Sequence, residues 1–315
     1  GGNQSGSGSG SGSGSNMQCR SLNKMLLDIL RDRVINTFRL NSALENTIEK
    51  FDCVNIATLL FHTGKKKITL SPNFIGRIAG RLNELTEELR AREASNALYG
   101  LRCMSSDSPE VRLLCVALAS KLSSTSSKLV AQAVGNAVYG LQSMTSDHEE
   151  VRLLLSVLAV KVSQCVEKLE AQNVGNALYG LRGMSSDHKE VRDMLTALTP
   201  KLLSVRETLN GQAIGNSLYG LQSMCSKEPA VREILQCLAN LIDDSGDSLN
   251  AQEIGNCLYG MKRMFSDAPE VRMLIGAIAN KVNMSREVLD AQAVGNALYG
   301  KLYMCMYIGV YWVDI

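Results

Sequence analysis

The stretch Gly135-Asn136-Ala137-Val138-Tyr139-Gly140 decides the fold of this chain because the chain repeats it. Its central tyrosine returns at intervals of 40 residues, without insertion or deletion, as Tyr99, Tyr139, Tyr179, Tyr219, Tyr259 and Tyr299. A fixed period of this length is typical of a repeat protein. The fold of one repeat therefore determines the fold of the whole repeat array.

Each repeat is predicted to hold two helices, termed helix A and helix B. Helix A of one repeat spans about 130–144, where Val134, Val138 and Leu141 follow the spacing of a half-buried helix. Helix B spans about 148–166 and carries its own apolar stripe. One such pair cannot bury these stripes, but stacked copies can. The sequence therefore predicts an all-α fold, a right-handed α-solenoid with a strict 40-residue period.

The ends of these helices carry capping signals. Asn210, Asn250 and Asp290 stand just before helix A, where a side-chain oxygen can accept a backbone N–H. An Asp-x-x-Glu pattern precedes helix B, and we expect it to form a capping box. Its members are Asp107/Glu110, Asp147/Glu150, Asp187/Glu190 and Asp267/Glu270. The fourth unit departs from the pattern with Lys227 and Ala230, so Ser226 is expected to cap there.

Outside the regular repeats the composition changes. We divide the chain into a flexible Gly/Ser-rich tail (1–16), N-terminal helices with one degenerate repeat (17–74), regular repeats (75–300) and an atypical terminus (301–315). Phe61 occupies the tyrosine position of the degenerate repeat. The run Lys65-Lys66-Lys67 is interpreted as a solvated loop or as a binding site. The terminus is interpreted as a truncated or mispredicted end, or as a docking peptide.

Composition excludes several classes of protein. The formal net charge is +2 over 315 residues, and residues 91–300 hold 20 Lys+Arg against 22 Asp+Glu. Nine scattered cysteines without a C-x-x-C pair, and three histidines, do not suggest a zinc site. We expect these cysteines to be small buried residues in a reducing, intracellular compartment. No apolar run is long enough to span a membrane. No catalytic or cofactor motif appears, so we expect neither an enzyme nor a bound cofactor or small-molecule substrate.

Two glycines recur inside helix A. Gly135 and Gly140 each cost about 1 kcal/mol relative to alanine in a helix interior. A cost repeated in nearly every unit is expected to serve the close approach of a neighbouring helix.

Polar and aromatic residues recur on the same side of helix A. An asparagine row comprises Asn96, Asn136, Asn176, Asn216, Asn256 and Asn296. Glutamines lie one turn earlier, at Gln132, Gln172, Gln212, Gln252 and Gln292. The amides either bond the loop of the adjacent unit or form a polar track for an extended ligand. The tyrosines either pack between layers or stack on nucleic-acid bases.

Other positions vary from unit to unit or carry a repeated charge. One variable position reads Arg102, Gln142, Arg182, Gln222 and Lys262. A second reads Ala133, Asn173, Ala213, Glu253 and Ala293 and is expected to be exposed. Both fit surface drift, and both fit the specificity sites of a modular reader. A recurring arginine at the start of helix B fits either a structural role or a phosphate track; its copies are Arg112, Arg152, Arg192, Arg232 and Arg272.

The unit Ala-Gln-x-Val/Ile-Gly-Asn-x-Leu-Tyr-Gly-Leu, followed by Met-x-Ser-Asp and a second helix, resembles the paired-helix repeats of organellar RNA-binding proteins. It is similar to octotricopeptide repeats, to FAST-kinase-like proteins and to helical subunits of the mitochondrial RNA-editing substrate-binding complex. The resemblance covers residues of about 50–300. It implies binding of single-stranded RNA in a mitochondrion or plastid, in RNA processing, editing or stability, without catalysis.

A second class of protein fits the same residues. Armadillo-type solenoids use an asparagine row to hold a peptide backbone, and the negative charge of the regular repeats favours such a protein-interaction scaffold. The candidate binding residues are the same under either interpretation: Arg102, Gln142, Arg182, Gln222 and Lys262, with the asparagine row from Asn96 to Asn296. A basic groove through Arg102, Arg182 and Lys262 would indicate RNA, and a neutral groove lined by amides would indicate a peptide.

Overall fold

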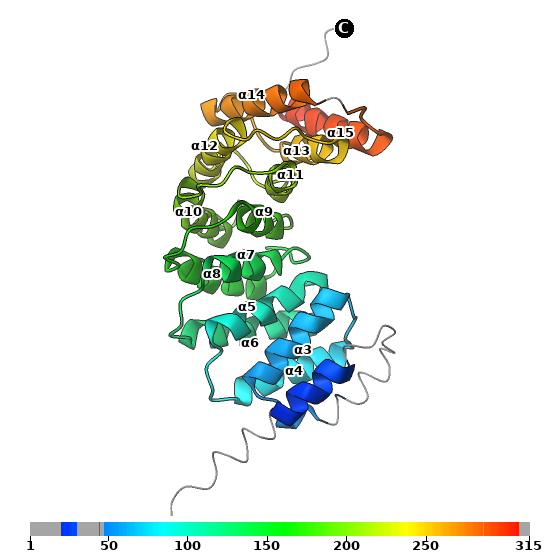
Figure 1. Cartoon of the computed structure of the whole chain (residues 1–315), viewed down its shortest axis with the longest axis vertical. Coiled ribbons are helices and arrows are strands. Elements are labelled where there is room, and N and C mark those ends of the chain that lie inside the picture. Colours follow the sequence, from blue (N-terminus) through cyan, green and yellow to red (C-terminus); the bar gives the residue numbers. More distant parts are fainter. Residues whose placement is uncertain (1–19, 30–43, 45–46, 286, 309–315) are drawn as a thin grey trace, which may run out of the picture.

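The chain folds into an α-solenoid in which two layers of helices run side by side (Figure 1). This computed structural model describes residues 20–29, 44, 47–285 and 287–308, with the backbone alone for 300–308. The predicted tail and residues 309–315 lie outside the described residues. Residues 20–29 are helical and, with Ile48–Lys50 (η1), precede the first helix pair.

The A layer and the B layer each form by packing of helices one repeat apart. The A helices are α3 (Cys53–Lys66), α5 (Ala91–Gly100), α7 (Ala131–Tyr139), α9 (Ala171–Gly180), α11 (Gly211–Gly220), α13 (Ala251–Gly260) and α15 (Ala291–Ile308). The B helices are α4 (Pro72–Glu84), α6 (Pro109–Ser124), α8 (Glu149–Ser163), α10 (Lys189–Leu203), α12 (Pro229–Asp243) and α14 (Pro269–Met284). One continuous apolar core lies between the layers.

Helix A is shorter than the sequence predicts. It ends at Tyr139 or at the glycine equivalent to Gly140, and a turn then leads to a buried methionine such as Met144. In the first regular repeat this turn is a short 3-10 helix, η2 (Leu101–Cys103). The last A helix, α15, differs because it continues past Gly300 to Ile308.

The glycines of helix A lie where neighbouring repeats approach most closely, as predicted. A Cβ atom on Gly140 would lie 1.9 Å from the carbonyl oxygen of Leu98, and one on Gly180 would lie 2.0 Å from that of Val138. Gly135 faces the opposite neighbour, because its Cβ would lie 3.0 Å from Asn173 Oδ1. The helices α7, α9, α11 and α13 therefore each contact the preceding repeat through one glycine and the following repeat through the other.

The capping predictions hold for helix A and fail for helix B. Asn210 accepts the backbone N–H of Ala213 at 2.8 Å, and Asn250 forms a capping box with Glu253. The expected Asp-x-x-Glu capping box is wrong, because helix B begins one residue later and its N-cap residues, such as Ser108, make no side-chain capping bond. Ser226 does not cap its helix either; its Oγ accepts the backbone N–H of Phe265 at 2.8 Å.

The recurring arginine of helix B organises the turn in place of that capping box. In every regular repeat its Nη1 donates to two successive backbone carbonyls before the helix; for Arg112 these belong to Ser106 and Asp107, at 2.9 and 3.0 Å. Arg112 also pairs with Glu150 of the next repeat at 3.4 Å. The structural interpretation of this arginine is therefore confirmed, because its Nη1 holds the turn before helix B. The equivalent bonds are made by Arg152, Arg192, Arg232 and Arg272.

Buried lysines form a second link between repeats that the sequence analysis missed. Lys161 is 8% exposed, and its Nζ donates to the carbonyl of Thr125, the C-cap of α6, at 2.5 Å. A cation there meets the negative end of the helix dipole and satisfies a carbonyl that the helix leaves open. Lys121, Lys201 and Lys281 make the same type of bond.

We predict that Gly180→Ala destabilises the fold by about 1–3 kcal/mol or more, because the added methyl group would overlap the carbonyl of Val138. Gly80→Ala in α4 is the control, since nothing lies within 4 Å of a Cβ at that position. The control should gain up to about 1 kcal/mol from helix propensity. Urea unfolding followed by circular dichroism measures both changes, and equal midpoints for the two variants would contradict the close-approach role.

We predict that Lys161→Met costs about 1–3 kcal/mol, because it leaves the buried Thr125 carbonyl without its donor. Lys168→Met removes the same charge from an exposed loop and should leave the unfolding midpoint almost unchanged. The same urea titration compares the two variants. A midpoint for Lys161→Met that matches the control would show that the buried amine adds no stability.

Candidate functional site

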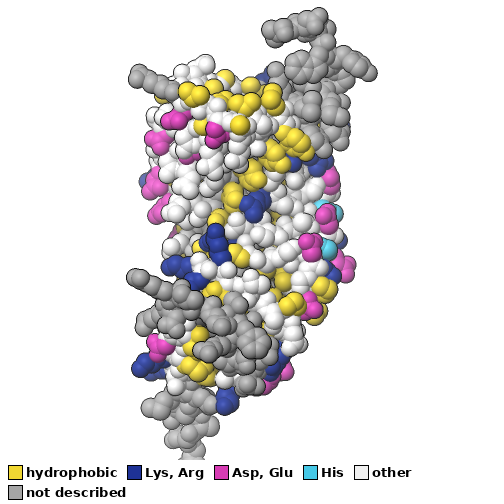
Figure 2. All heavy atoms as spheres, turned by 90° about the vertical axis from the view of Figure 1, so that its right-hand side faces the viewer, with side chains coloured by type: hydrophobic (Ala, Val, Ile, Leu, Met, Phe, Trp, Pro, Cys, Tyr) yellow, Lys and Arg dark blue, Asp and Glu magenta, His cyan; other side chains and the backbone are white. Residues whose placement is uncertain are grey.

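The candidate site is the A-helix face, the surface of the A layer that points away from the B helices. Figure 2 shows this face, with yellow side chains in a diagonal line, dark blue side chains along that line and mostly white surface beside it. Most of the acidic side chains in this view lie toward the two edges. The face is built from equivalent positions of successive A helices, so each feature recurs once per repeat.

A continuous stack of aromatic rings runs along the A-helix face. Successive tyrosine rings from Tyr99 to Tyr299 have centroids 5.4 to 5.9 Å apart, with interplanar angles of 15° to 26°. Phe61 begins the stack 5.3 Å from Tyr99, which places the degenerate repeat in register with the others. Each internal ring thus has a ring on both sides, so a base cannot insert without separating two repeats. The prediction that the tyrosines pack between layers is confirmed.

Cations lie against this aromatic stack. The guanidinium carbon of Arg102 lies 5.0 Å from the Tyr99 centroid and 5.4 Å from that of Tyr139. The Arg182 guanidinium lies 4.8 Å from the Tyr179 centroid, and Lys262 Nζ lies 4.7 Å from that of Tyr259. These are cation–π distances. The stack therefore holds three of the sequence-predicted site residues at fixed positions.

The two arginines are also held by hydrogen bonds. Nη1 of Arg102 donates to the hydroxyl of Tyr99, and Nη1 of Arg182 donates to that of Tyr179. Arg182 Nε donates in addition to the carbonyl of Gln142 at 2.8 Å. Burial raises the pKa of the Tyr179 phenol, with a smaller opposing effect from Arg182, so its hydroxyl stays protonated at neutral pH.

Glutamines occupy the same position in the remaining internal repeats. Gln142 and Gln222 are half-buried, as Arg182 is. From Tyr99 to Tyr259 the face therefore alternates between a cation and a neutral amide. Beyond the predicted set, Lys65 lies 5.9 Å from the Phe61 centroid and adds a cation at the degenerate repeat. The run Lys65-Lys66-Lys67 indicates a positive charge in this part of the sequence, but it does not predict the contact between Lys65 and the Phe61 ring.

The asparagine row lies beside the aromatic stack. All six of its members are half-buried. Within the described residues, none of these amides donates to or accepts from another protein group, so the predicted bond to an adjacent loop is absent. The glutamines one turn earlier are exposed in every regular repeat that carries one. The face therefore presents a row of amides whose donors and acceptors are open to a ligand.

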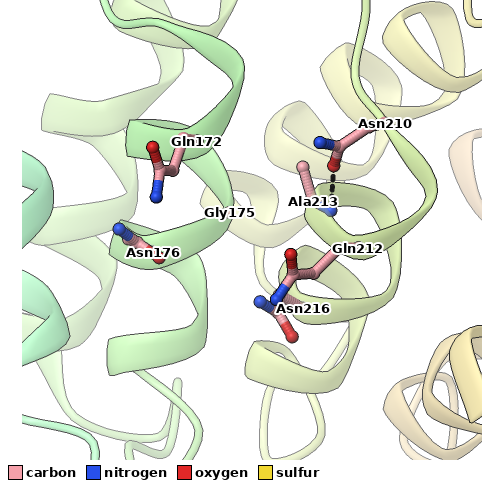
Figure 3. A pocket seen from close by; sticks show the side chains of 7 residues that line it. All are labelled: Gln172, Gly175, Asn176, Asn210, Gln212, Ala213 and Asn216. Atoms are coloured by element: carbon pink, nitrogen blue, oxygen red, sulfur yellow. Dashed lines mark hydrogen bonds between the residues drawn. The ribbon is translucent and has the colours of Figure 1, made fainter.

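Shallow clefts between successive A helices bring these amides together. The cleft between α9 and α11 measures about 270 Å³ and is lined by polar or small residues (Figure 3). Gln172 and Asn176 lie on one wall and Gln212 and Asn216 on the other, and Asn210 lines the cleft while its Oδ1 caps α11. An equivalent cleft between α5 and α7 includes Asn96, Gln132 and Asn136, with Arg92 at its edge.

The second variable position contributes small residues such as Ala213 to the lining of the clefts, but its expected exposure is wrong. Ala133, Asn173, Ala213 and Ala293 are buried, and Glu253 is half-buried. The side chains from Asn173 onward pack on the glycine equivalent to Gly135 in the preceding repeat. These residues vary because a glycine in the preceding repeat leaves room for side chains of different size. The variation is therefore a consequence of helix packing.

Charge is distributed unequally between this face and the rest of the repeats. The segments 91–104, 131–144, 171–184, 211–224, 251–264 and 291–300, which supply the face, hold five Lys+Arg and two Asp+Glu. Their net charge is +3, whereas the rest of residues 91–300 carries −5. The cleft between α9 and α11 itself is lined by no charged residue. The face is thus weakly basic, with a neutral amide row along it.

Among the described residues, no group of three or more His, Cys, Asp or Glu side chains is placed to hold a metal ion. None of the described helices combines the length and apolar character that a membrane span requires. Burial raises the pKa of Cys53 to about 11 and that of Cys115 to about 12, with smaller effects from charged neighbours, so these thiols are protonated at neutral pH.

No protein-family model matches the chain, and the curated proteins contain no match to it.

We predict that alkylation at pH 8 separates the cysteines by burial. Exposed Cys103 should be labelled by iodoacetamide in the native protein, whereas buried Cys115 and Cys257 should be labelled only after unfolding. Their raised pKa values and the closed core both slow the reaction. Peptide mass spectrometry before and after urea treatment measures this. Rapid native labelling of Cys115 would contradict the packing of α6.

Proposed function

We propose that this protein binds single-stranded RNA along the A-helix face. The proposal is supported mainly by one observation: asparagine amides without partners among the described residues recur in six consecutive A helices, in segments with a net charge of +3, whereas the rest of residues 91–300 carries −5. Side-chain amides can donate to and accept from base edges, and arginine and lysine neutralise phosphates. By its resemblance to organellar repeat proteins, the chain would act on transcripts of a mitochondrion or plastid, in processing, editing or stability, without catalysis of its own.

The aromatic stack limits how RNA can bind. Because neighbouring tyrosines already cover the faces of the internal rings, bases would be read by their edges rather than by insertion between rings. Single-stranded RNA offers such edges, whereas the deep major groove of an RNA duplex hides them. A face with few cations also predicts moderate affinity, since phosphate contacts dominate RNA affinity.

An armadillo-type peptide scaffold is the second candidate. It is favoured by the cleft between α9 and α11, whose lining is neutral and rich in amides. Amides at regular spacing can hold the backbone of an extended peptide as well as bases. The positive balance of the whole face favours RNA over this candidate.

We predict that negative charge in the asparagine row weakens RNA binding at least tenfold. The variant replaces three row members with aspartate: Asn136→Asp, Asn176→Asp and Asn216→Asp. The control makes the same changes on exposed asparagines of the B layer: Asn240→Asp, Asn280→Asp and Asn283→Asp. Fluorescence anisotropy with a labelled single-stranded RNA of mixed sequence, in about 50–200 mM salt, measures both. Circular dichroism checks that each variant is folded.

Two results would contradict this proposal. Wild-type protein that binds no RNA even at about 50 mM salt would exclude RNA binding by these repeats. Equal losses in the row variant and the B-layer control would mean that RNA is held by net charge rather than by this face. A lysine-rich peptide that binds the wild type, and binds the aspartate variant more tightly, would instead support the scaffold.

A further inference from the structure

The position that follows each tyrosine by three residues alternates in charge along the A-helix face. It holds a cation at Arg102, Arg182 and Lys262 and a glutamine at Gln142 and Gln222. All five side chains are half-buried, and the three cations lie 4.7 to 5.0 Å from a tyrosine centroid. The alternation is therefore a difference in charge at equivalent positions of the repeat, and it gives the face a period of two repeats.

The best-defined member of this set is Arg182. Its guanidinium lies 4.8 Å from the Tyr179 centroid, donates to the Tyr179 hydroxyl and reaches back to the Gln142 carbonyl at 2.8 Å. A guanidinium has five N–H donors, and these two bonds leave several of them open. No carboxylate pairs with Arg182 among the described ion pairs. The side chain is thus fixed in place while part of its donor set remains available.

Other arginines near Arg182 differ from it in the partners that hold their guanidinium groups. Arg263, one residue after Lys262, contacts Asp187 at 3.4 Å and donates to the Ser223 carbonyl at 3.0 Å. The arginines of helix B are held in the same way by backbone carbonyls. Arg182 also donates to a backbone carbonyl, that of Gln142, but among the described residues neither Arg102 nor Arg182 pairs with a carboxylate.

We propose that Arg102, Arg182 and Lys262 each clamp one phosphate of the bound strand, so that phosphate contacts recur once every two repeats. The intervening repeats, with Gln142 and Gln222, contact the strand through neutral groups only. The proposal rests on the proposed RNA binding and adds a register to it. The unit of recognition is then a pair of repeats, of about 80 residues.

The experiment places arginine in the neutral repeats. Gln142→Arg with Gln222→Arg puts two cations beside Tyr139 and Tyr219, at positions equivalent to Arg182. The control, Gln164→Arg with Gln236→Arg, adds the same charge at exposed glutamines of the B layer. A third protein carries Arg102→Gln, Arg182→Gln and Lys262→Gln. Binding of a labelled single-stranded RNA of mixed sequence is measured for each over a salt series.

The expected results follow from counterion release. Each phosphate contact on a single strand contributes about 0.7 to the slope of log K against log salt concentration. The triple glutamine variant should therefore lose about 2 from the slope, and the double arginine variant should gain about 1.4. The B-layer control should leave the slope unchanged, because its charges lie away from the strand.

Other outcomes separate the two proposals. If the wild type binds RNA but the triple glutamine variant keeps its slope, the phosphate clamps are wrong while RNA binding along the face stands. If the double arginine variant and its control raise the slope equally, the added charge acts without a register and the two-repeat period is wrong. If the wild type binds no RNA, the proposed function fails first, and this inference fails with it.

Discussion

The structure depends on the contact between a glycine at the end of each A helix and a backbone carbonyl of the preceding A helix. At Gly140, Gly180, Gly220 and Gly260, an added Cβ would lie about 2 Å from that carbonyl oxygen. No side chain can be accommodated at such a distance, so the contact fixes the separation of consecutive repeats. The conformational cost of a helical glycine, about 1 kcal/mol, is therefore offset by packing that extends along the solenoid.

That separation determines the properties of the A-helix face. Because consecutive helices are held so close, the tyrosines one residue before these glycines meet ring to ring at 5.4 to 5.9 Å. The stacked rings in turn carry Arg102, Arg182 and Lys262. The same spacing leaves shallow clefts in which the amides of adjacent repeats face one another. The contact that builds the core thus also places every candidate ligand-binding group.

Much of this arrangement could be predicted from the sequence, because the 40-residue period and the apolar stripes specify stacked helix pairs. The glycine contacts and the place of Phe61 in the tyrosine register were predicted as well. The buried lysines were not, since a charged residue at helical spacing normally indicates a solvated face. The Asp-x-x-Glu pattern led to a wrong prediction of the cap of helix B. Arg112 or its equivalent donates to two backbone carbonyls of the turn, and the helix begins one residue later than the pattern indicates. Exposure at position 133 and its equivalents depends on a neighbouring repeat, which a single repeat's pattern does not reveal.

The repeats also provide an internal comparison that bears on function. A residue repeated in every unit because the fold needs it should hydrogen-bond or pack tightly within the protein, as the glycines, the tyrosines and the helix B arginines all do. The asparagine row is identical in all six regular repeats, yet its amides make no bond to the described protein. Asparagine is also a poor helix former, so the position carries a small cost in each repeat. Hydrogen bonds within the described protein therefore do not explain the asparagine row, and the proposed binding of RNA along successive repeats would explain it.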